Sequence, residues 1–279
     1  MTIITIARGS LAGAGMLAEG VASELGIPCI SREIVVAAAD AAGVPETVLA
    51  EQFNRAPTVF HRHSRERDAY LWFIRSVLYQ RASEGSFVYH GHGGHFLLAD
   101  IPNLLRVGVV APMEFRIAGV MESHGLDHTA AEKHVQQTDK FRDQWVRHLY
   151  GVDWLDPSFY DLMINLKTLD TREACELLTR TAQFERFAQT DESRQKVADV
   201  ALATRVTAVL AMGGELALGR LELTARAGVL TIDGQARSST ARDDIRTAAE
   251  NAIGEAELRF QVAVGAQSVT WGFEHRQSG

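Results

Sequence analysis

Hydrophobic and polar positions alternate in two ways along the first two-thirds of the chain. Short apolar, β-branched runs predict strands at residues 3–7, 27–30, 86–90, 104–110 and 160–165. Between the first two runs, Leu17, Val21 and Leu25 recur at helical spacing. Further helices are predicted at residues 32–42, 68–83, 113–124 and 129–150. Strands alternating with helices predict an α/β fold, with a parallel five-stranded sheet flanked by helices.

The pattern changes after a polar break at residues 190–196. A helical run to Met212 is followed by two alternating segments, LELTARAG and VLTIDGQA, then by a second helical pattern and a last strand. Turns are expected at Ala227–Gly228 and at Asp233–Gly234. The order αββαβ predicts a small α+β domain at the C-terminal side. The expected domains are residues 1–190 and 191–267, with a tail at 268–279.

Composition and charge narrow the class of protein. The chain has 279 residues, of which 46% are hydrophobic and 23% charged, as in ordinary globular proteins. The formal net charge of −7 does not favour binding to nucleic acid or to an anionic membrane. Cys29 and Cys175 match no metal or redox spacing. The start of the chain lacks a basic leader, and no apolar run is long enough to cross a bilayer. We therefore expect a cytoplasmic protein.

A glycine-rich segment lies between the first predicted strand and helix, in ARGSLAGAGML. Glycines there let backbone amides at a helix start converge on an anion, so the segment predicts a phosphate cradle. A tight turn that only allows close packing is the alternative. The candidate phosphate-binding residues are Gly9, Ser10, Gly13, Ala14, Gly15 and Met16.

The segment lacks the charged end of the usual phosphate loop. That loop ends in Gly-Lys-Ser/Thr, whereas this chain has Gly15, Met16 and Leu17. The lysine supplies charge to the transferring phosphate, and the hydroxyl holds magnesium. Losing one preorganised donor costs about 10²–10³ in rate. The loop therefore predicts phosphate binding with impaired catalysis unless other cations replace the missing ones.

Three segments of the chain resemble the cytidylate kinase-like family of P-loop nucleoside monophosphate kinases. They are IITIARGSLAGAGMLAEGVASELGIPCISREIV, SFVYHGHGGHFLLADIPNLLRVGVVAPMEFRIAGVMESHGL and TDKFRDQWVRHLYGVDWLDPSFYDLMIN. The likeness covers about residues 1–185, with the motifs in the family's order. It implies the P-loop kinase fold, ATP with Mg²⁺ as phosphoryl donor, and CMP or dCMP as the first acceptor to consider.

The chain departs from that family where the chemistry would take place. The family's loop arginine corresponds to Gly15, and its Gly-Arg-Gly turn reads Gly91-His92-Gly93. Ser31 replaces an aspartate and is followed by Arg32 and Glu33. These departures predict altered or impaired turnover on an unchanged fold. On the resemblance, the acceptor-binding candidates are Arg32, His92 and Arg116, the last of which follows Ala-Pro.

Basic residues recur along the helix predicted at 129–150. Lys133, Lys140 and Arg147 are spaced by seven, so they fall on nearly one face, with a drift of about 20° per step. Acidic residues interleave with them, so a solvated face of mixed charge is the alternative. In monophosphate kinases, basic lid side chains close over the phosphates. The resemblance therefore makes Arg142, Arg147 and Arg8 the catalytic candidates.

The HGHGGH segment raises the question of a metal site. It places His90, His92 and His95 within six residues, but no cysteine or carboxylate accompanies them at a ligand spacing. No metal site is therefore predicted. His92 is expected to line the acceptor pocket as a neutral or switchable donor.

The C-terminal segment RLELTARAGVLTIDGQARSSTARDDIRTAAENAIGEAELRFQVAVG resembles a BON domain, over about residues 195–265. The likeness implies an αββαβ unit associated with envelope or phospholipid binding or with protein association. This copy lacks a basic face, so a regulatory or oligomeric role is expected. An appended stabilising domain without a ligand is the alternative.

Three functions remain open from the sequence. The first is ATP-dependent phosphoryl transfer to a nucleoside monophosphate such as CMP. The second is a catalytically silent protein that senses a nucleotide and passes its occupancy to the C-terminal domain. The third is a scaffold in which the glycines serve packing alone. Nucleotide ligands and a possible homo-oligomer are the expected partners.

Overall fold

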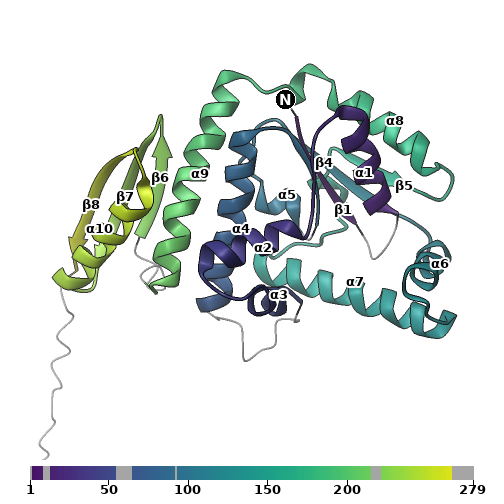
Figure 1. Ribbon diagram of the computed structural model, residues 1–279, viewed down its shortest axis with the longest axis horizontal. Coiled ribbons are helices and arrows are strands. Elements are labelled where there is room, and N and C mark those ends of the chain that lie inside the picture. Colours follow the sequence, from purple (N-terminus) through teal and green to yellow (C-terminus); the bar gives the residue numbers. More distant parts are fainter. Residues whose placement is uncertain (1, 9–12, 55–64, 92, 215–220, 266–279) are drawn as a thin grey trace, which may run out of the picture.

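A computed structural model describes residues 2–8, 13–54, 65–91, 93–214 and 221–265. Its main body is built on a five-stranded sheet with strand order β2-β3-β1-β4-β5 (Figure 1). All of its described pairings are parallel. The strands are β1 (Ile3–Arg8), β2 (Cys29–Ile30), β3 (Phe87–His90), β4 (Leu104–Val110) and β5 (Leu162–Asn165). The predicted α/β class is confirmed.

Helices bury both faces of this sheet, which is why its strands are apolar on both sides. On one face, Ile4 and Ile6 of β1 pack in a core with α1 (Ala14–Leu25) and α8 (Thr171–Ala182). On the other face, Ile3 lies in a core that includes α2 (Glu33–Ala42) and α4 (Arg65–Glu84). The sequence pattern did not predict α8, nor α3 (Glu46–Asn54) and α5 (Gly94–Leu97). None of the described helices has the length and apolar character needed to cross a membrane.

Two helices after β4 form a hairpin, α6 (Met113–His124) and α7 (His128–Tyr150). Their facing sides share a small core of Ile117, Val120, Ala131 and Val135. Asp127 caps α7, its carboxylate accepting from the backbone N–H of Ala130 at 2.8 Å. Figure 1 shows α7 crossing the molecule at the carboxyl ends of the strands, with α6 at its outer end.

The second half of α7 is anchored to the main body. Trp145 and Val146 are buried in a cluster with Trp154, and Phe96 of α5 packs against it. Helix α7 therefore has one half in the hairpin and one half fixed over the sheet.

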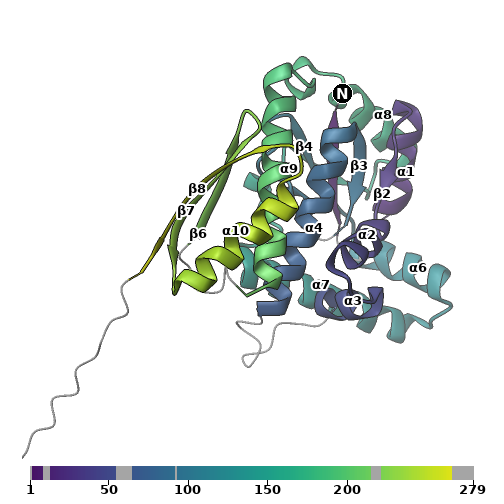
Figure 2. The ribbon, with the colours of Figure 1, turned by 60° about the vertical axis from the view of Figure 1, so that its left-hand side comes forward.

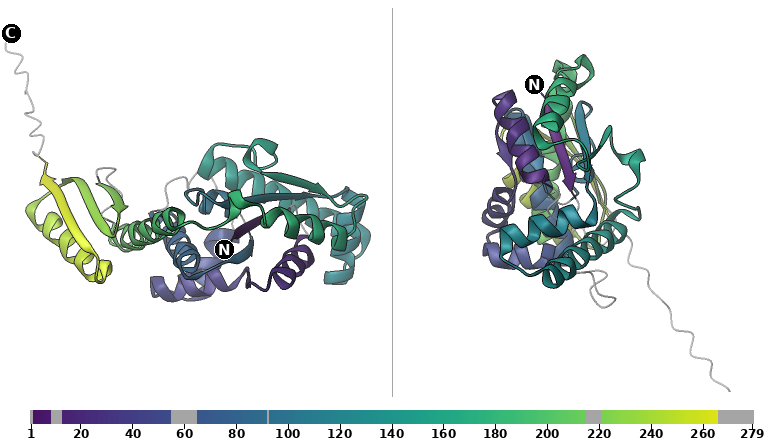
Figure 3. Two further views of the ribbon diagram at one scale, coloured as in Figure 1. Left: turned by 90° about the horizontal axis from the view of Figure 1, so that it is seen from above. Right: turned by 90° about the vertical axis from the view of Figure 1, so that its right-hand side faces the viewer.

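The C-terminal part is a second, three-stranded sheet with strand order β6-β7-β8. Its elements are α9 (Asp191–Met212), β6 (Leu221–Arg226), β7 (Val229–Ala236), α10 (Ser239–Ile253) and β8 (Glu257–Val264). Strands β6 and β7 are antiparallel, and β7 and β8 are parallel. Figure 3 shows this part at one end of an elongated molecule. The element order is the αββαβ expected from the sequence.

One of the two turns predicted in this part is wrong. Ala227 and Gly228, with φ of 51° and 78°, turn the chain from β6 into β7. Asp233 and Gly234 instead lie inside β7, where they pair with Glu222 and Leu221 of β6. Gly234 has a positive φ of 138°, yet it still pairs with Leu221 of β6 in the antiparallel ladder. Tertiary pairing overrides the local turn signal here.

Helix α9 joins the two parts. Val197 and Ala208 belong to the core of the main body, whereas Leu202, Val206 and Leu210 belong to the core of the C-terminal sheet. Figure 2 shows α9 running alongside α4, with the C-terminal sheet on its other side. The boundary at residues 190 and 191 stays a prediction, because α9 serves both cores.

Buried Asp199 of α9 fixes the turn between β6 and β7 to this helix. Its carboxylate accepts hydrogen bonds from the backbone N–H groups of Ala227 and Gly228, each at 2.9 Å. The turn between β6 and β7 is thereby held against the helix that packs on α4.

Candidate functional site

The first helix begins at Ala14, inside the predicted phosphate cradle, so Ala14, Gly15 and Met16 lie in its first turn. Gly13 has φ +74°, a left-handed conformation that favours glycine, and its carbonyl accepts from the N–H of Leu17 at 3.0 Å. The N–H groups of the first turn have no acceptor inside the helix, so they are available to an anion. Ala14 is buried, Gly15 is half-buried, and Met16 is 64% exposed. Gly9 and Ser10 lie outside the described residues.

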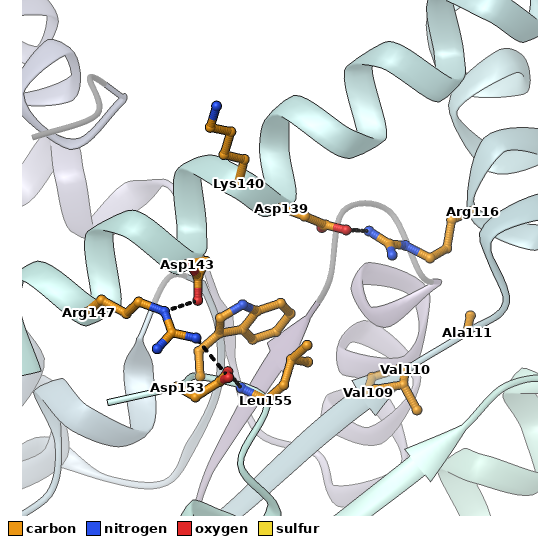
Figure 4. Close-up of a pocket in the computed structure, with 11 residues that line it drawn as sticks. Val109, Val110, Ala111, Arg116, Asp139, Lys140, Asp143, Arg147, Asp153 and Leu155 are labelled. Carbon is orange, nitrogen blue, oxygen red and sulfur yellow. Dashed lines mark hydrogen bonds and ion pairs between the residues drawn. The ribbon is translucent and has the colours of Figure 1, made fainter. Parts of the chain in front are cut away.

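A cavity of about 400 Å³ lies at the carboxyl end of β4 (Figure 4). Its floor is Val109, Val110 and Ala111. Helices α6 and α7 and the following turn supply the rest of its lining: Arg116, Asp139, Lys140, Asp143, Arg147, Asp153, Trp154 and Leu155. Arg8 ends β1, and its backbone is in register with Val109. The cavity thus lies where ligands bind in open parallel sheets, beyond the carboxyl ends of the strands.

Both arginines of this cavity are held by carboxylates. Arg116 Nη2 donates to Asp139 Oδ1 and Oδ2 at 2.6 and 2.5 Å. Arg147 donates from Nε to Asp143 Oδ1 at 2.7 Å and from Nη2 to Asp153 Oδ2 at 2.9 Å. Figure 4 shows the two pairs on opposite sides of the cavity.

The two pairs differ in exposure. The side chain of Arg116 is 12% exposed, whereas that of Arg147 is 53% exposed. The hydrogen bond to Asp143 raises the pKa of Arg147, so this side chain stays charged.

The formal charges lining the cavity balance. Arg116, Lys140 and Arg147 face Asp139, Asp143 and Asp153, so three positive charges meet three negative ones. A phosphate entering the cavity would compete with the carboxylates for the same guanidinium groups. The sequence spacing had pointed to Lys140 and Arg147 on one face of α7, and both line the cavity. Lys133 is exposed and absent from its lining.

Arg142 faces a different space. It is 9% exposed and lines a smaller cavity of about 20 Å³ with Ala7, Gly91, Gly93, His95, Val146 and Trp154. This cavity lies at the carboxyl ends of β1 and β3. Trp154 lines both cavities and is thus shared by the one that Arg142 lines and the one that Arg147 lines.

The glycine turn after β3 is shaped by its neighbours. Gly93 has φ +60°, and a Cβ there would lie 3.0 Å from Cζ3 of Trp145. The turn therefore needs glycine at this position for both conformation and space. His92, the predicted acceptor-binding residue of the turn, lies outside the described residues.

Arg32, the third acceptor-binding candidate, is exposed at the start of α2. Its Nη2 donates to Glu46 Oε1 of α3 at 2.6 Å. The structure brings Arg116 and Arg147 to one cavity and Arg142 to the next, and it leaves Arg32 apart from the lining of both.

The sequence-based site lacked several residues of this region. Asp143, Asp153 and Leu155 line the larger cavity, and His95 lines the smaller one. The Trp-x-Asp-Pro stretch that carried part of the family resemblance was the available signal for Trp154 and its neighbours. Within the part of the chain that the structure describes, no group of three or more His, Cys, Asp or Glu residues could hold a metal ion.

The chain is similar in sequence and in fold to known proteins. Cytidylate kinase of Ignicoccus hospitalis is 25% identical over 183 residues, which are 64% of this chain and 98% of that protein. Cytidylate kinase of Methanopyrus kandleri is 28% identical over 107 residues, 36% of this chain and 55% of that protein. The crystal structure of an uncharacterized protein from Eubacterium ventriosum supports the fold, at a TM-score of 0.52 and 23% identity, covering 64% of this chain and 97% of its own. The sequence model of the cytidylate kinase-like family matches residues 3–168, and the chain belongs to that family.

Proposed function

We propose that this protein is a nucleotide phosphotransferase that moves the γ-phosphoryl group of ATP to a nucleoside monophosphate, with CMP or dCMP as acceptor. The observation that carries the proposal is the 400 Å³ cavity at the carboxyl end of β4, which three basic side chains line. An acceptor phosphate oxygen attacks the γ-phosphorus, the bond to the β–γ bridging oxygen breaks, and ADP leaves.

The proposed roles follow the charges at the site. The N–H groups at the start of α1, from Ala14 to Met16, hold donor phosphates in place of a loop lysine. Arg147 and Lys140 of α7 neutralise the transferring group, as basic lid residues do. Arg142, next to the glycine turn, faces the acceptor. Arg116 supports the cavity from α6.

Magnesium would enter this site bound to ATP, because the described residues include no group of three or more His, Cys, Asp or Glu that could hold a metal ion by themselves. Asp139, Asp143 and Asp153 line the cavity, and carboxylate oxygens are preferred ligands of Mg²⁺. Each of them also accepts from an arginine, so the nucleotide phosphates and water would supply most of the ligands. The ion would offset phosphate charge.

A coupled ADP-release assay with ATP and each of CMP, dCMP, UMP, AMP and GMP tests the proposal. We expect turnover with a pyrimidine monophosphate, and a fall of about 10²-fold in kcat for Arg147→Gln, the cost of losing one transition-state donor. Arg180→Gln is the matched control, because Arg180 forms an exposed (i, i+4) pair with Glu176 on α8. Absence of turnover above background with every acceptor would reject the enzymatic function.

A second candidate is a silent nucleotide sensor. It is favoured by the balanced charges of the cavity and by the loop residues Gly15 and Met16, which provide no cation. Nucleotide occupancy would then be passed through α9, which is shared by both cores, to a BON-like C-terminal domain. Calorimetry together with the turnover assay separates the sensor from the enzyme, because a sensor binds ATP or CMP but shows no turnover.

A further inference from the structure

His95 is a buried polar side chain with nothing to bind among the described residues. It lies in α5, directly after the glycine turn, and is 4% exposed. Neither ring nitrogen, Nδ1 nor Nε2, has a hydrogen-bond partner there. Leaving such groups unpaired in the interior costs stability, so their retention points to a partner that the described residues do not supply.

The ring of His95 is held in place by aromatic neighbours. Its centroid lies 4.0 Å from that of Phe96 and 4.7 Å from that of Tyr160. Tyr160 is itself fixed, because its hydroxyl donates to the carbonyl oxygen of Trp154 at 2.6 Å. The imidazole is thus preorganised at the wall of the small cavity that Arg142 also lines.

The cavity limits what the partner can be. About 20 Å³ is enough for one water-sized polar group and too little for a phosphate or a base. Burial lowers the pKa of His95 to about 4, with the nearby positive charge of Arg106 as the smaller cause. The ring is therefore neutral at pH 7 and offers one acceptor and one donor.

A hydroxyl group matches these requirements. Its O–H can donate to the unprotonated ring nitrogen, while its oxygen accepts from the guanidinium of Arg142. A phosphate oxygen can only accept and would leave that nitrogen unpaired. A hydroxyl carried by a ligand is then bound by two groups that already face one cavity.

We propose that His95 is a specificity-determining residue that binds a sugar hydroxyl of the acceptor nucleotide, together with Arg142. This inference rests on the proposed function, and it names the part of the acceptor that the small cavity recognises. It predicts that the protein distinguishes acceptors by their sugar hydroxyls.

Calorimetric titration with CMP and with 2′,3′-dideoxy-CMP tests the inference. The wild type should bind CMP roughly three- to tenfold more tightly, which is the effect of one net hydrogen bond. His95→Phe should bind the two equally, and it should keep the wild-type affinity for ATP. His124→Phe is the control, since His124 is an exposed histidine at the end of α6.

Thermal unfolding without ligand gives a second readout. A binding residue whose polar atoms are unpaired should be replaced by Phe with no loss of Tm, because no internal hydrogen bond is removed. A marked fall in Tm for His95→Phe alone would indicate a structural role and overturn the inference.

The outcomes separate the inference from the proposed function. Equal binding of CMP and its dideoxy analogue by the wild type, or a preference that survives in His95→Phe, overturns the role of His95 while acceptor binding stands. If the wild type binds neither compound, the proposed acceptor class itself fails, and the inference fails with it.

Discussion

Two arginines on one helix experience opposite environments. Arg142 and Arg147 are five residues apart on α7, yet one is 9% exposed beside the glycine turn and the other is 53% exposed and held by two carboxylates. The helix buries its inner side against Trp154 and α5 and leaves the other side at the larger cavity. The comparison teaches that two arginines close together in the sequence can line two different cavities.

The largest expected effect is a loss of stability on removing Trp145, which anchors the buried side of α7. Trp145→Ala should lower the free energy of unfolding by about 3–5 kcal/mol, since a fully buried aromatic side chain leaves a cavity. Denaturant unfolding measures this loss. Phe115→Ala, at an exposed aromatic position of α6, should stay within about 0.5 kcal/mol of the wild type. Equal losses in both variants would contradict the anchored arrangement.

Removing the charge of Arg142 comes next. Arg142→Met keeps much of the side-chain length but removes the guanidinium proposed to donate to the sugar hydroxyl of the acceptor. It should reduce kcat/KM for the acceptor about 10–10²-fold, the cost of one hydrogen bond to a charged group. Steady-state kinetics with the acceptor varied would show it, with the affinity for ATP retained. An unchanged kcat/KM would place Arg142 in packing alone.

The pH dependence of stability distinguishes the smaller cavity, which His95 lines, from the larger one. His95 has a folded-state pKa of about 4, below the value of about 6.5 for an unperturbed histidine, so the unfolded chain binds its proton first. Stability contributed by the neutral ring is complete above the unfolded value and is lost as pH falls from there toward 4.

Unfolding measured across that window should therefore be less pH-dependent in His95→Phe than in the wild type. The largest slope that one proton can add is about 1.4 kcal/mol per pH unit. Matching slopes in the two proteins would show that folding does not lower the pKa of His95.

The smallest expected effect is a change in ATP affinity at Arg147. Asp153→Asn removes one of the two carboxylates that hold Arg147, and it makes the net charge of the cavity lining more positive by one. ATP affinity should rise several-fold at low ionic strength and return toward the wild-type value at high salt, because exposed charges are screened. Fluorescence titration at two salt concentrations measures this. A fall in affinity would indicate that Asp153 itself helps to hold the nucleotide or its metal ion.

Much of the fold was predictable because it depends on local patterns. Alternating apolar runs and helical stripes gave the five strands, the main helices and the αββαβ order of the C-terminal part. The error at Asp233–Gly234 has a tertiary cause, since β6 pairs through that dipeptide. The true turn at Ala227–Gly228 is held by Asp199, which lies 28 residues earlier in the chain.

The candidate site was predictable in part. The glycines marked the start of α1, and the spacing of seven brought Lys140 and Arg147 to one cavity. The carboxylates that hold Arg147 could not be assigned, because Asp153 reaches it from a turn beyond the end of α7. His95 could not be identified as a neutral, unpaired group, since its burial, to which the distant Tyr160 contributes, sets its protonation state.

The sequence by itself determined the α/β class, the position of the glycine-rich segment before α1 and the supply of basic residues on α7. These follow from periodicity and from the backbone freedom of glycine, which act over a few neighbouring residues. The tertiary structure alone decided that Arg142 and Arg147 line separate cavities, with Trp154 in the lining of both. That outcome depends on which surfaces exclude water, and exclusion of water is set by segments far apart in the chain.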